Sequence, residues 1–259
     1  MSALLSCTDL TMRFGGLTAL DKLNLDVAKG DVLGLVGPNG SGKTTFFNVV
    51  TGIYRPSAGT VVFDGQDVTS RTAQEIYRLG IARTFQRSRL CLDLTVFDNV
   101  MIGNHKNLDM GIVHNLLARG RFRAECKRNL ERVKTLLHGL NPALVKRVGQ
   151  PVSMLSMIDR RRVEVCRALV SDPVLLFLDE PSAGMTHDET KRLMDEILVL
   201  SDGGKNFTVV LIEHEMEVIR RVTNRCVVLN FGRKLCEGDY ETVTADPFVK
   251  EAYLGTELD

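Results

Sequence analysis

Three short apolar runs along the chain are continuous rather than alternating. They cover residues 32–36, 174–178 and 208–212, consist mostly of Val, Leu and Ile, and end in polar or acidic residues or in a glycine-rich loop. Continuous runs of this length are typical of parallel strands that are covered on both faces. Between the last two runs, residues 189–200 place apolar side chains at helical spacing. This order predicts a doubly wound α/β core whose ligands gather at the strand ends.

Two other segments show the alternation of half-exposed strands. Residues 23–27 alternate strictly between apolar and polar, and residues 60–63 do so more loosely. Such patterns favour antiparallel strands with one face in water. We therefore expect a side sheet beside the parallel core.

The middle of the chain has few strand signals. From about residue 94 to 162 it is rich in Leu, Arg, Lys and Glu, with a glycine-rich interruption near residues 111–120. This composition predicts a mainly helical lobe. No repeat of 20 to 50 residues is present, which argues against a solenoid.

Composition narrows the function classes. The 259 residues are 44% hydrophobic and 25% charged, as in an ordinary soluble globular protein, and the net charge of +1 gives no general attraction to nucleic acid. The apolar runs are far shorter than the roughly 18 to 20 residues that cross a bilayer, so we expect any membrane role to be peripheral. The six cysteines are widely spaced and form no CxxC pair, so the sequence does not suggest a zinc site. We expect the cysteines to be free thiols of a protein in the reducing cytoplasm. The start of the chain lacks the pattern of a secretory signal.

A phosphate-binding loop is predicted directly after the run 32–36 and before a helix at residues 45–50. The motif G-x-x-x-x-G-K-[ST] is satisfied by Gly37, Pro38, Asn39, Gly40, Ser41, Gly42, Lys43 and Thr44, with Thr45 following. Its glycines let backbone N–H groups surround an anion, and the helix start adds a positive dipole end. We expect Lys43 to reach the β and γ phosphates of ATP and the hydroxyl of Thr44 to ligate Mg²⁺. A chance match to four specified positions has a frequency on the order of one per cent.

Two carboxylates and a histidine follow the later strands. Asp179 and Glu180 close the run 174–178, and His214 follows the run 208–212. The ends of parallel strands share one sheet edge, where the phosphate loop must also lie. We expect Asp179 to hold Mg²⁺ through water, Glu180 to act as general base for the attacking water, and His214 to contact the γ phosphate.

Four motifs in this order resemble those of ABC-transporter ATPases: GPNGSGKTT, RTFQ at residues 83–86, LLFLDEPSAGM at residues 175–185 and LIEHEM at residues 211–216. The segments MRFGGLTAL, GIARTFQ, LTVFDNV and EAYLG narrow the resemblance to the branched-chain amino-acid uptake subfamily, and it covers essentially the whole chain.

The resemblance implies a fold and further site residues. The expected fold is that of an ABC ATPase within the P-loop NTPases: a mostly parallel core sheet and an antiparallel β subdomain from residues 1–93 and 163–259, and a helical subdomain at about 94–162, all in one domain. Phe14 matches the aromatic residue that stacks on adenine. Gln86 matches the glutamine that senses Mg²⁺ and contacts the membrane subunit, and His214 matches the switch histidine.

The resemblance also implies partners. It predicts a second ABC ATPase subunit, identical or different, facing this one head to tail, with each ATP held between one P-loop and the other subunit's LSGGQ signature. Two membrane permeases and an extracytoplasmic solute-binding protein complete such an importer, and the ATPase is peripheral on the cytoplasmic face of the inner membrane. Branched-chain or other amino acids are the suggested solutes, and nucleic acid is not an expected partner.

The signature itself departs from the family pattern. Its place is taken by Leu155, Ser156, Met157, Ile158 and Asp159. Met157 and Ile158 add bulk where glycines let backbone N–H groups approach the phosphate, and Asp159 adds negative charge near an anion. Loss of one preorganised donor typically costs about 10² to 10³ in rate. We therefore expect one competent site in a heterodimer, in which the partner supplies an intact signature.

Other interpretations stay open at this point. The usual aspartate after Glu180 is absent from residues 184–188, and His187 is interpreted as a surface residue rather than a substitute. Three interpretations of residues 155–159 stay open: a natural variant that the family tolerates, an inactive signature, or a deliberate alteration of the chain. A regulatory ATP sensor and a non-transport ABC protein are the alternative functions; the near-neutral charge and the single nucleotide cassette count against the second.

Overall fold

The computed structural model describes residues 3–86, 88–107, 119–201 and 207–254. It divides into two compact units, which are described separately. The first comprises Met1–Arg83, Val174–Glu180 and Asn206–Asp259, and the second comprises Thr84–Pro173 and Pro181–Lys205. The subdomain boundaries given above remain a prediction. Most of the glycine-rich interruption near residues 111–120 lies outside the described residues.

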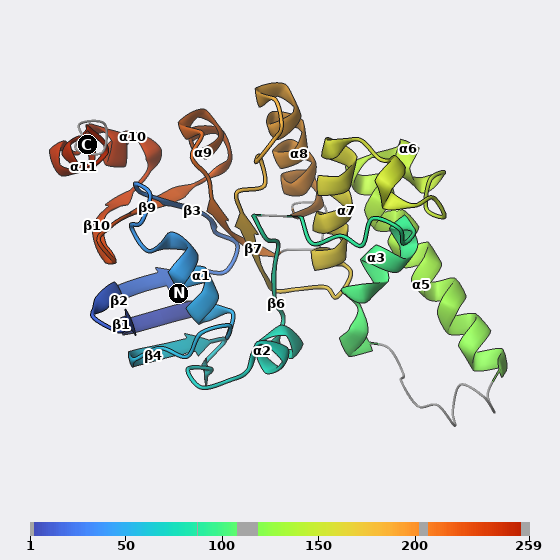
Figure 1. Cartoon of the computed structure of the whole chain (residues 1–259), viewed down its shortest axis with the longest axis horizontal. Helices are drawn as coiled ribbons and strands as arrows, with labels where there is room; N and C mark the ends of the chain where they lie inside the picture. Colours follow the sequence, from blue (N-terminus) through green and yellow to red (C-terminus); the bar gives the residue numbers. More distant parts are fainter. Residues whose placement is uncertain (1–2, 87, 108–118, 202–206, 255–259) are drawn as a thin grey trace. The chain divides into compact units, whose positions relative to one another are not determined.

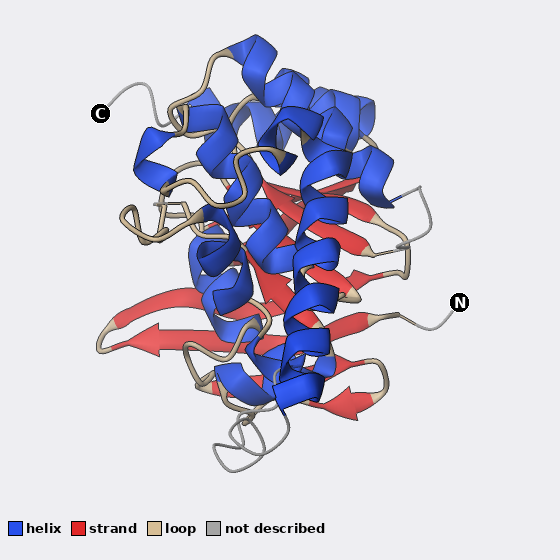
Figure 2. Ribbon diagram, turned by 90° about the vertical axis from the view of Figure 1, so that its right-hand side faces the viewer, coloured by secondary structure: helices blue, strands red, loops and turns tan. Residues whose placement is uncertain are grey.

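The smaller sheet of the first unit is antiparallel, with strand order β2-β1-β4-β5. Its strands are β1 (Leu5–Phe14), β2 (Leu17–Val27), β4 (Ala58–Phe63) and β5 (Gln66–Asp67). Figure 2 shows the strands in red, and the long ribbon of this sheet begins near the N-terminus. The side sheet predicted from the alternating segments is confirmed.

The larger sheet of the first unit has strand order β10-β9-β3-β8-β7-β6. Its strands are β3 (Val32–Val36), β6 (Ile81–Arg83), β7 (Leu175–Asp179), β8 (Thr208–Ile212), β9 (Arg225–Asn230) and β10 (Arg233–Gly238). Neighbours are parallel except for the antiparallel pair β9 and β10. The three predicted continuous strands are confirmed; β7 begins and ends one residue later than predicted, and Asp179 is its last residue.

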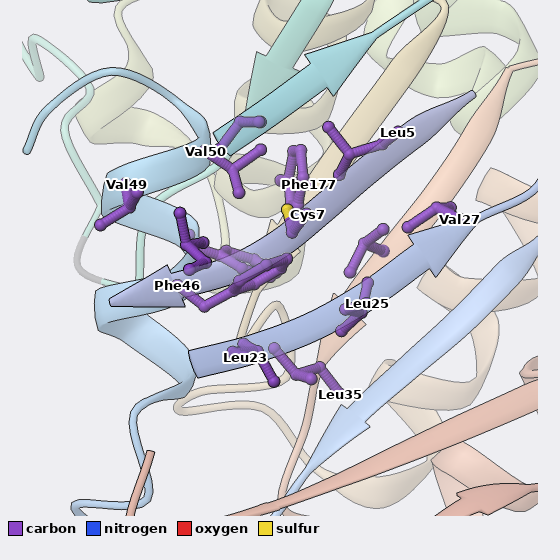
Figure 3. Packing of buried hydrophobic residues seen from close by; sticks show 14 of the residues in the cluster. Leu5, Cys7, Leu23, Leu25, Val27, Leu35, Phe46, Val49, Val50 and Phe177 are labelled. Atoms are coloured by element: carbon purple, nitrogen blue, oxygen red, sulfur yellow. The ribbon is translucent and has the colours of Figure 1, made fainter. Parts of the chain in front are cut away.

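Helix α1 (Lys43–Val50) joins the two sheets (Figure 1). Phe46 and Phe47 on this helix are fully buried in a cluster that includes Leu23 of β2, Leu35 of β3 and Phe177 of β7 (Figure 3). Full burial of one such aromatic side chain stabilises the fold by roughly 1.5 to 3 kcal/mol. The start of α1, and with it the phosphate loop, is therefore held by the main core of the unit.

The other face of β3 is covered by α9 (Met216–Val222). A Cβ atom on Gly34 would lie 3.0 Å from Cγ2 of Thr223, at the end of this helix, and 3.3 Å from Cγ2 of Ile219. Burial on both faces explains why this strand is a continuous apolar run. The remaining helices of the unit are α2 (Ala73–Leu79), α10 (Tyr240–Ala245) and α11 (Pro247–Leu254).

Helices make up most of the second unit. Those within the described residues are α3 (Val96–Ile102), η1 (His105–Asn107), α5 (Arg119–Leu140), α6 (Pro142–Val145), η2 (Val152–Met154), α7 (Met157–Leu169) and α8 (His187–Leu200). Helix α8 confirms the helix predicted at residues 189–200. It begins two residues earlier because Thr186 and Glu189 form a reciprocal capping box.

Candidate functional site

Three strand ends of the first unit meet at one edge of the larger sheet. Strand β3 leads into the phosphate loop, β7 ends at Asp179 directly before Glu180, and β8 ends two residues before His214. Strand β8 pairs in parallel with both β3 and β7, so these carboxyl ends are neighbours. The structure thus brings together the loop, the two carboxylates and the histidine that the sequence singled out.

The phosphate loop has little room for side chains. Gly37, Gly40 and Gly42 have φ angles of 145°, 78° and 107°, which L side chains rarely adopt. A Cβ atom on Gly37 would lie 2.2 Å from the carbonyl oxygen of Leu229 and 2.8 Å from Oγ of Ser41. The backbone therefore turns tightly against β9 before helix α1 begins.

Lys43 is buried at the start of α1 and donates to the loop itself. Its Nζ lies 2.6 Å from the carbonyl oxygen of Gly37 and 2.9 Å from that of Pro38. Burial lowers the pKa of the ammonium group, and the nearby carboxylates of Glu180 and Asp179 act in the opposite direction. An ammonium group has three N–H donors. Two of them shape the loop here, and the third can reach a phosphate oxygen.

Ser41 carries a polar atom that the loop does not satisfy. Its Oγ is buried and has no hydrogen-bond partner among the described residues. Its backbone is engaged, because its N–H donates to Pro38 and its carbonyl accepts from Gly232. Leaving a buried hydroxyl unpaired costs about 1 to 3 kcal/mol. A phosphate oxygen held by the loop would satisfy this group.

Asp179 is buried at the end of β7 and paired with Arg83. Nη2 of Arg83 lies 2.8 Å from its Oδ2, and the two side chains are only 7% and 4% exposed. Burial raises the pKa of the Asp179 carboxyl, and the Arg83 guanidinium acts against that shift. The arginine thus favours the ionised carboxylate that a metal ion needs.

Glu180 has the strained backbone common at functional sites. Its φ angle is +45°, and its N–H donates to the carbonyl of Ile212, the last residue of β8. Its Oε1 lies 2.6 Å from Nε2 of His214, whose side chain is 46% exposed. A carboxylate beside a solvent-accessible imidazole is suited to accept and pass on a proton.

Phe14 ends β1 and is 42% exposed. Its ring meets the ring of Tyr54 edge to face, with centroids 5.3 Å apart. This contact orients the phenyl ring while leaving part of it in solvent. Phe14 is therefore available for stacking, as the resemblance implies.

Gln86 lies in the second unit, where its side chain is exposed. Arg161 of α7 donates to the carbonyls of Phe85 and Gln86 and to that of Ala183. Its guanidinium also pairs with Glu164 at 2.8 Å. The segment that carries Gln86 is thus fixed to the helix that follows the altered signature.

The altered signature forms the start of α7. Oγ of Ser156 accepts from the N–H of Asp159 and caps the helix, while Leu155 is buried and Met157 is 49% exposed. The carboxylate of Asp159 is 2.9 Å from Nη1 of Arg162 and 3.7 Å from Nη1 of Arg147. Its negative charge, expected from the sequence to oppose a phosphate, is therefore paired with two guanidinium groups of the second unit, of which Arg162 also pairs with Glu196 at 2.6 Å. These ion pairs do not reduce the size of the Met157 and Ile158 side chains, which stand where the family pattern has glycines.

The loop and the strand ends fit ATP and Mg²⁺. Three glycines at positive φ, the unsatisfied Ser41 hydroxyl and the Lys43 ammonium form a cradle for an anion. The exposed Thr44 hydroxyl and the Asp179 carboxylate are hard oxygen ligands, the kind that Mg²⁺ takes together with phosphate oxygens.

Two partners of this site were missed by sequence reasoning. Arg83 entered only as part of the motif RTFQ, because its partner Asp179 is far away in the sequence and no local pattern indicates the pair. Tyr253 of α11 was noted only as part of the ending. Burial raises the pKa of its phenol, and a hydrogen bond with the backbone of Gly37 acts in the opposite direction.

A glycine-rich loop between a parallel strand and a helix, with paired carboxylates after a nearby strand, defines a P-loop nucleotide-binding protein. The family model described as ABC transporter matches residues 20–183. The chain belongs to this family, whose ATP-binding proteins are ATPases.

Relatives match along nearly the whole chain. The high-affinity branched-chain amino acid transport ATP-binding protein LivG of Escherichia coli is 39% identical over 97% of this chain and 98% of its own length. The probable LivG protein of Methanocaldococcus jannaschii is 30% identical, with 97% of both chains covered.

Solved structures agree with the fold. A nucleotide-free ATP-binding cassette from an ABC transporter has a TM-score of 0.83 at 30% identity, over 97% of this chain and 99% of that one. An ATP-binding cassette in its ADP conformation also has a TM-score of 0.83, at 29% identity, over 98% of this chain and 100% of that one. The predicted ABC ATPase fold is confirmed. Among the described residues, none of the helices has the length and apolar character needed to cross a membrane.

Proposed function

We propose that this chain hydrolyses Mg·ATP to energise the import of a small solute, branched-chain or other amino acids, through separate membrane subunits. The contact between Glu180 and His214, at the strand ends of the larger sheet, carries the proposal. It prepares Glu180 to act as a general base, which a sensor that only binds ATP does not need. The names and full-length match of the relatives support amino acids as the solutes.

Each predicted residue has a role in this mechanism. Lys43 and the loop N–H groups hold the phosphates, the Ser41 hydroxyl donates one further hydrogen bond to a phosphate oxygen, and Phe14 stacks on the base. Mg²⁺, when bound to Thr44 and Asp179, would neutralise charge that develops on the phosphates. Glu180 accepts the proton of the attacking water, and His214 keeps the carboxylate oriented and faces the γ phosphate. Gln86 senses the bound Mg·ATP and, through its contact with the membrane subunit, transmits the nucleotide state to that subunit.

The chain acts in this proposal with an unlike ATPase partner, two permeases and an extracytoplasmic solute-binding protein, on the cytoplasmic face of the inner membrane. Its own P-loop side keeps Lys43, Asp179, Glu180 and His214, while residues 155–159 offer a poor signature to the neighbour. One composite site is therefore competent and the other is slow.

Mixing experiments test the proposal. Purified chain alone should release phosphate from ATP slowly, and addition of an ATPase partner with an intact LSGGQ signature should restore turnover. Liposomes that contain this chain, the partner and the permeases, with the solute-binding protein outside and ATP inside, should then take up leucine. Brisk turnover by this chain alone would contradict the heterodimer.

The regulatory ATP sensor is the second candidate. The uncompensated bulk of Met157 and Ile158 favours it, since a weak signature limits hydrolysis at one site. Transport that is unchanged by Glu180→Gln would support the sensor over the proposal.

A further inference from the structure

Arg83 joins two elements that carry different parts of the proposed magnesium site. It is the last residue of β6, the strand next to β7, and is paired in register with Phe177. Its Nη2 donates to Asp179 at the end of β7. Its Nη1 donates to Oδ1 of Asn48 at 2.7 Å and to Oγ1 of Thr51 at 3.1 Å, both at the end of α1.

The residues around Arg83 hold its guanidinium group in place. Its guanidinium lies 5.8 Å from the ring centroid of Phe47, and that ring meets Phe177 edge to face at 4.7 Å. The acceptor Thr51 is itself fixed, because its hydroxyl donates to the carbonyl of Phe47 at 2.6 Å. With the side chain 7% exposed, water competes little for the guanidinium, so these bonds are strong and directional.

The two elements bear the oxygen ligands for Mg²⁺. Helix α1 presents Thr44 in its first turn, and β7 presents Asp179 at its end. A metal ion needs both oxygens at fixed positions, and Mg²⁺ tolerates little departure from octahedral geometry. The Arg83 guanidinium binds both α1 and Asp179, so it can fix the distance between the Thr44 hydroxyl and the Asp179 carboxylate.

We propose that Arg83 is a positioning residue for magnesium: it orients the Asp179 carboxylate and fixes it relative to the helix that carries Thr44. The inference rests on the proposed Mg·ATP site and assigns to that site a residue that contacts neither nucleotide nor metal. Partners that orient a metal ligand typically contribute about 10- to 100-fold in metal affinity.

The test measures how much Mg²⁺ strengthens nucleotide binding. The affinity of the purified full chain for trinitrophenyl-ATP is determined in excess Mg²⁺ and in EDTA, and the ratio is the magnesium enhancement. Arg83→Met should reduce this ratio by about 10- to 100-fold, with little change of affinity in EDTA. Arg83→Lys should fall between, because an ammonium cannot reach both elements with a planar fork.

A matched control lies at the opposite edge of the same sheet. Arg225 begins β9 and pairs with Asp31 at 2.6 Å, away from the strand ends that carry the site. Arg225→Met removes this ion pair and a second one with Glu237, so it should lower the melting temperature while keeping the full magnesium enhancement. A loss of enhancement in this control as large as in Arg83→Met would overturn the proposal.

A double-mutant cycle shows whether Arg83 acts through Asp179. In an Asp179→Asn background, Arg83→Met should cause little further loss of enhancement, and an undiminished further loss contradicts the proposed route. If Arg83→Met does not fold, Arg83→Lys and Thr51→Val carry the test. An enhancement in folded Arg83 variants that equals or exceeds that of the wild type overturns the inference alone. A wild-type chain without any enhancement contradicts the proposed Mg·ATP site itself.

Discussion

Nε2 of His214 lies 2.6 Å from Oε1 of Glu180, although the two residues follow different strands. The contact depends on the parallel pairing of β7 with β8, in which Asp179 is the partner of Ile212. It also depends on the positive φ of Glu180, which turns the chain directly after the strand. Such strain persists only where the surroundings hold it, and it is common at reacting centres.

Replacement of Glu180 by Gln keeps the size of the side chain but removes the proton acceptor. Turnover by the chain mixed with its ATPase partner should fall by about 10² to 10⁴, while ATP affinity stays near that of the wild type. Phosphate release and equilibrium binding check the two quantities separately. An equal fall in both would indicate a binding role instead.

His214→Ala should lower turnover more than it lowers ATP affinity, because the imidazole orients Glu180. His187→Ala is the matched control, since His187 is an exposed first residue of α8 in the second unit. Phosphate release by both variants, each mixed with the partner, gives the comparison. If the His187 variant loses as much activity, the interpretation of that residue as a surface position is wrong.

Residues 157–159 allow bulk and charge to be separated. Met157→Gly with Ile158→Gly should raise the turnover of the chain on its own, because the change opens the approach to backbone N–H groups. Asp159→Gln alone should change turnover little, because Arg162 and Arg147 already balance the carboxylate. Phosphate release by each purified variant checks this, and a larger gain from Asp159→Gln would show that the charge is the obstacle. The two glycines should also lower the melting temperature by weakening the first turn of α7.

Two glycines of the phosphate loop should differ in their sensitivity to alanine. Gly40 has open space around its Cβ position, so Gly40→Ala costs only the left-handed backbone, about 1 to 2 kcal/mol. In Gly37→Ala the added carbon would also lie 2.2 Å from the Leu229 carbonyl, so the loss of unfolding free energy should be clearly larger. Denaturant unfolding without nucleotide measures both, and equal losses would contradict the close approach of loop and β9.

The sequence predicted the central strands well because both of their faces are buried. Strand β1 was not predicted. Its pairing with β2 shifts register between Cys7 and Leu10 and again before Met12, and Asp9 has a φ of 48°. These irregularities break the alternation on which a strand is recognised. Strand β6 was missed because it has only three residues, Ile81–Arg83, too few for any periodicity.

For the site, local motifs indicated the loop, the carboxylates and the histidine, because each stands directly after an apolar run. The partners of those residues were not predictable in the same way. Arg83 reaches Asp179 only because β6 and β7 are neighbours in the sheet, and Asp159 meets Arg147 only through the packing of the second unit. The sequence pattern contains no record of such pairings.

The position of β3 has a consequence for how the protein is made. Val32 pairs with Val209 of β8, and Leu33 pairs with Arg225 of β9, so this strand has no sheet to join until those residues have been synthesised. The nascent chain therefore exposes an apolar strand and an unsupported loop for most of translation, when such segments are prone to aggregate. We expect the growing chain to need chaperones, or early collapse of the antiparallel ribbon β1–β2, until β8 and β9 have emerged.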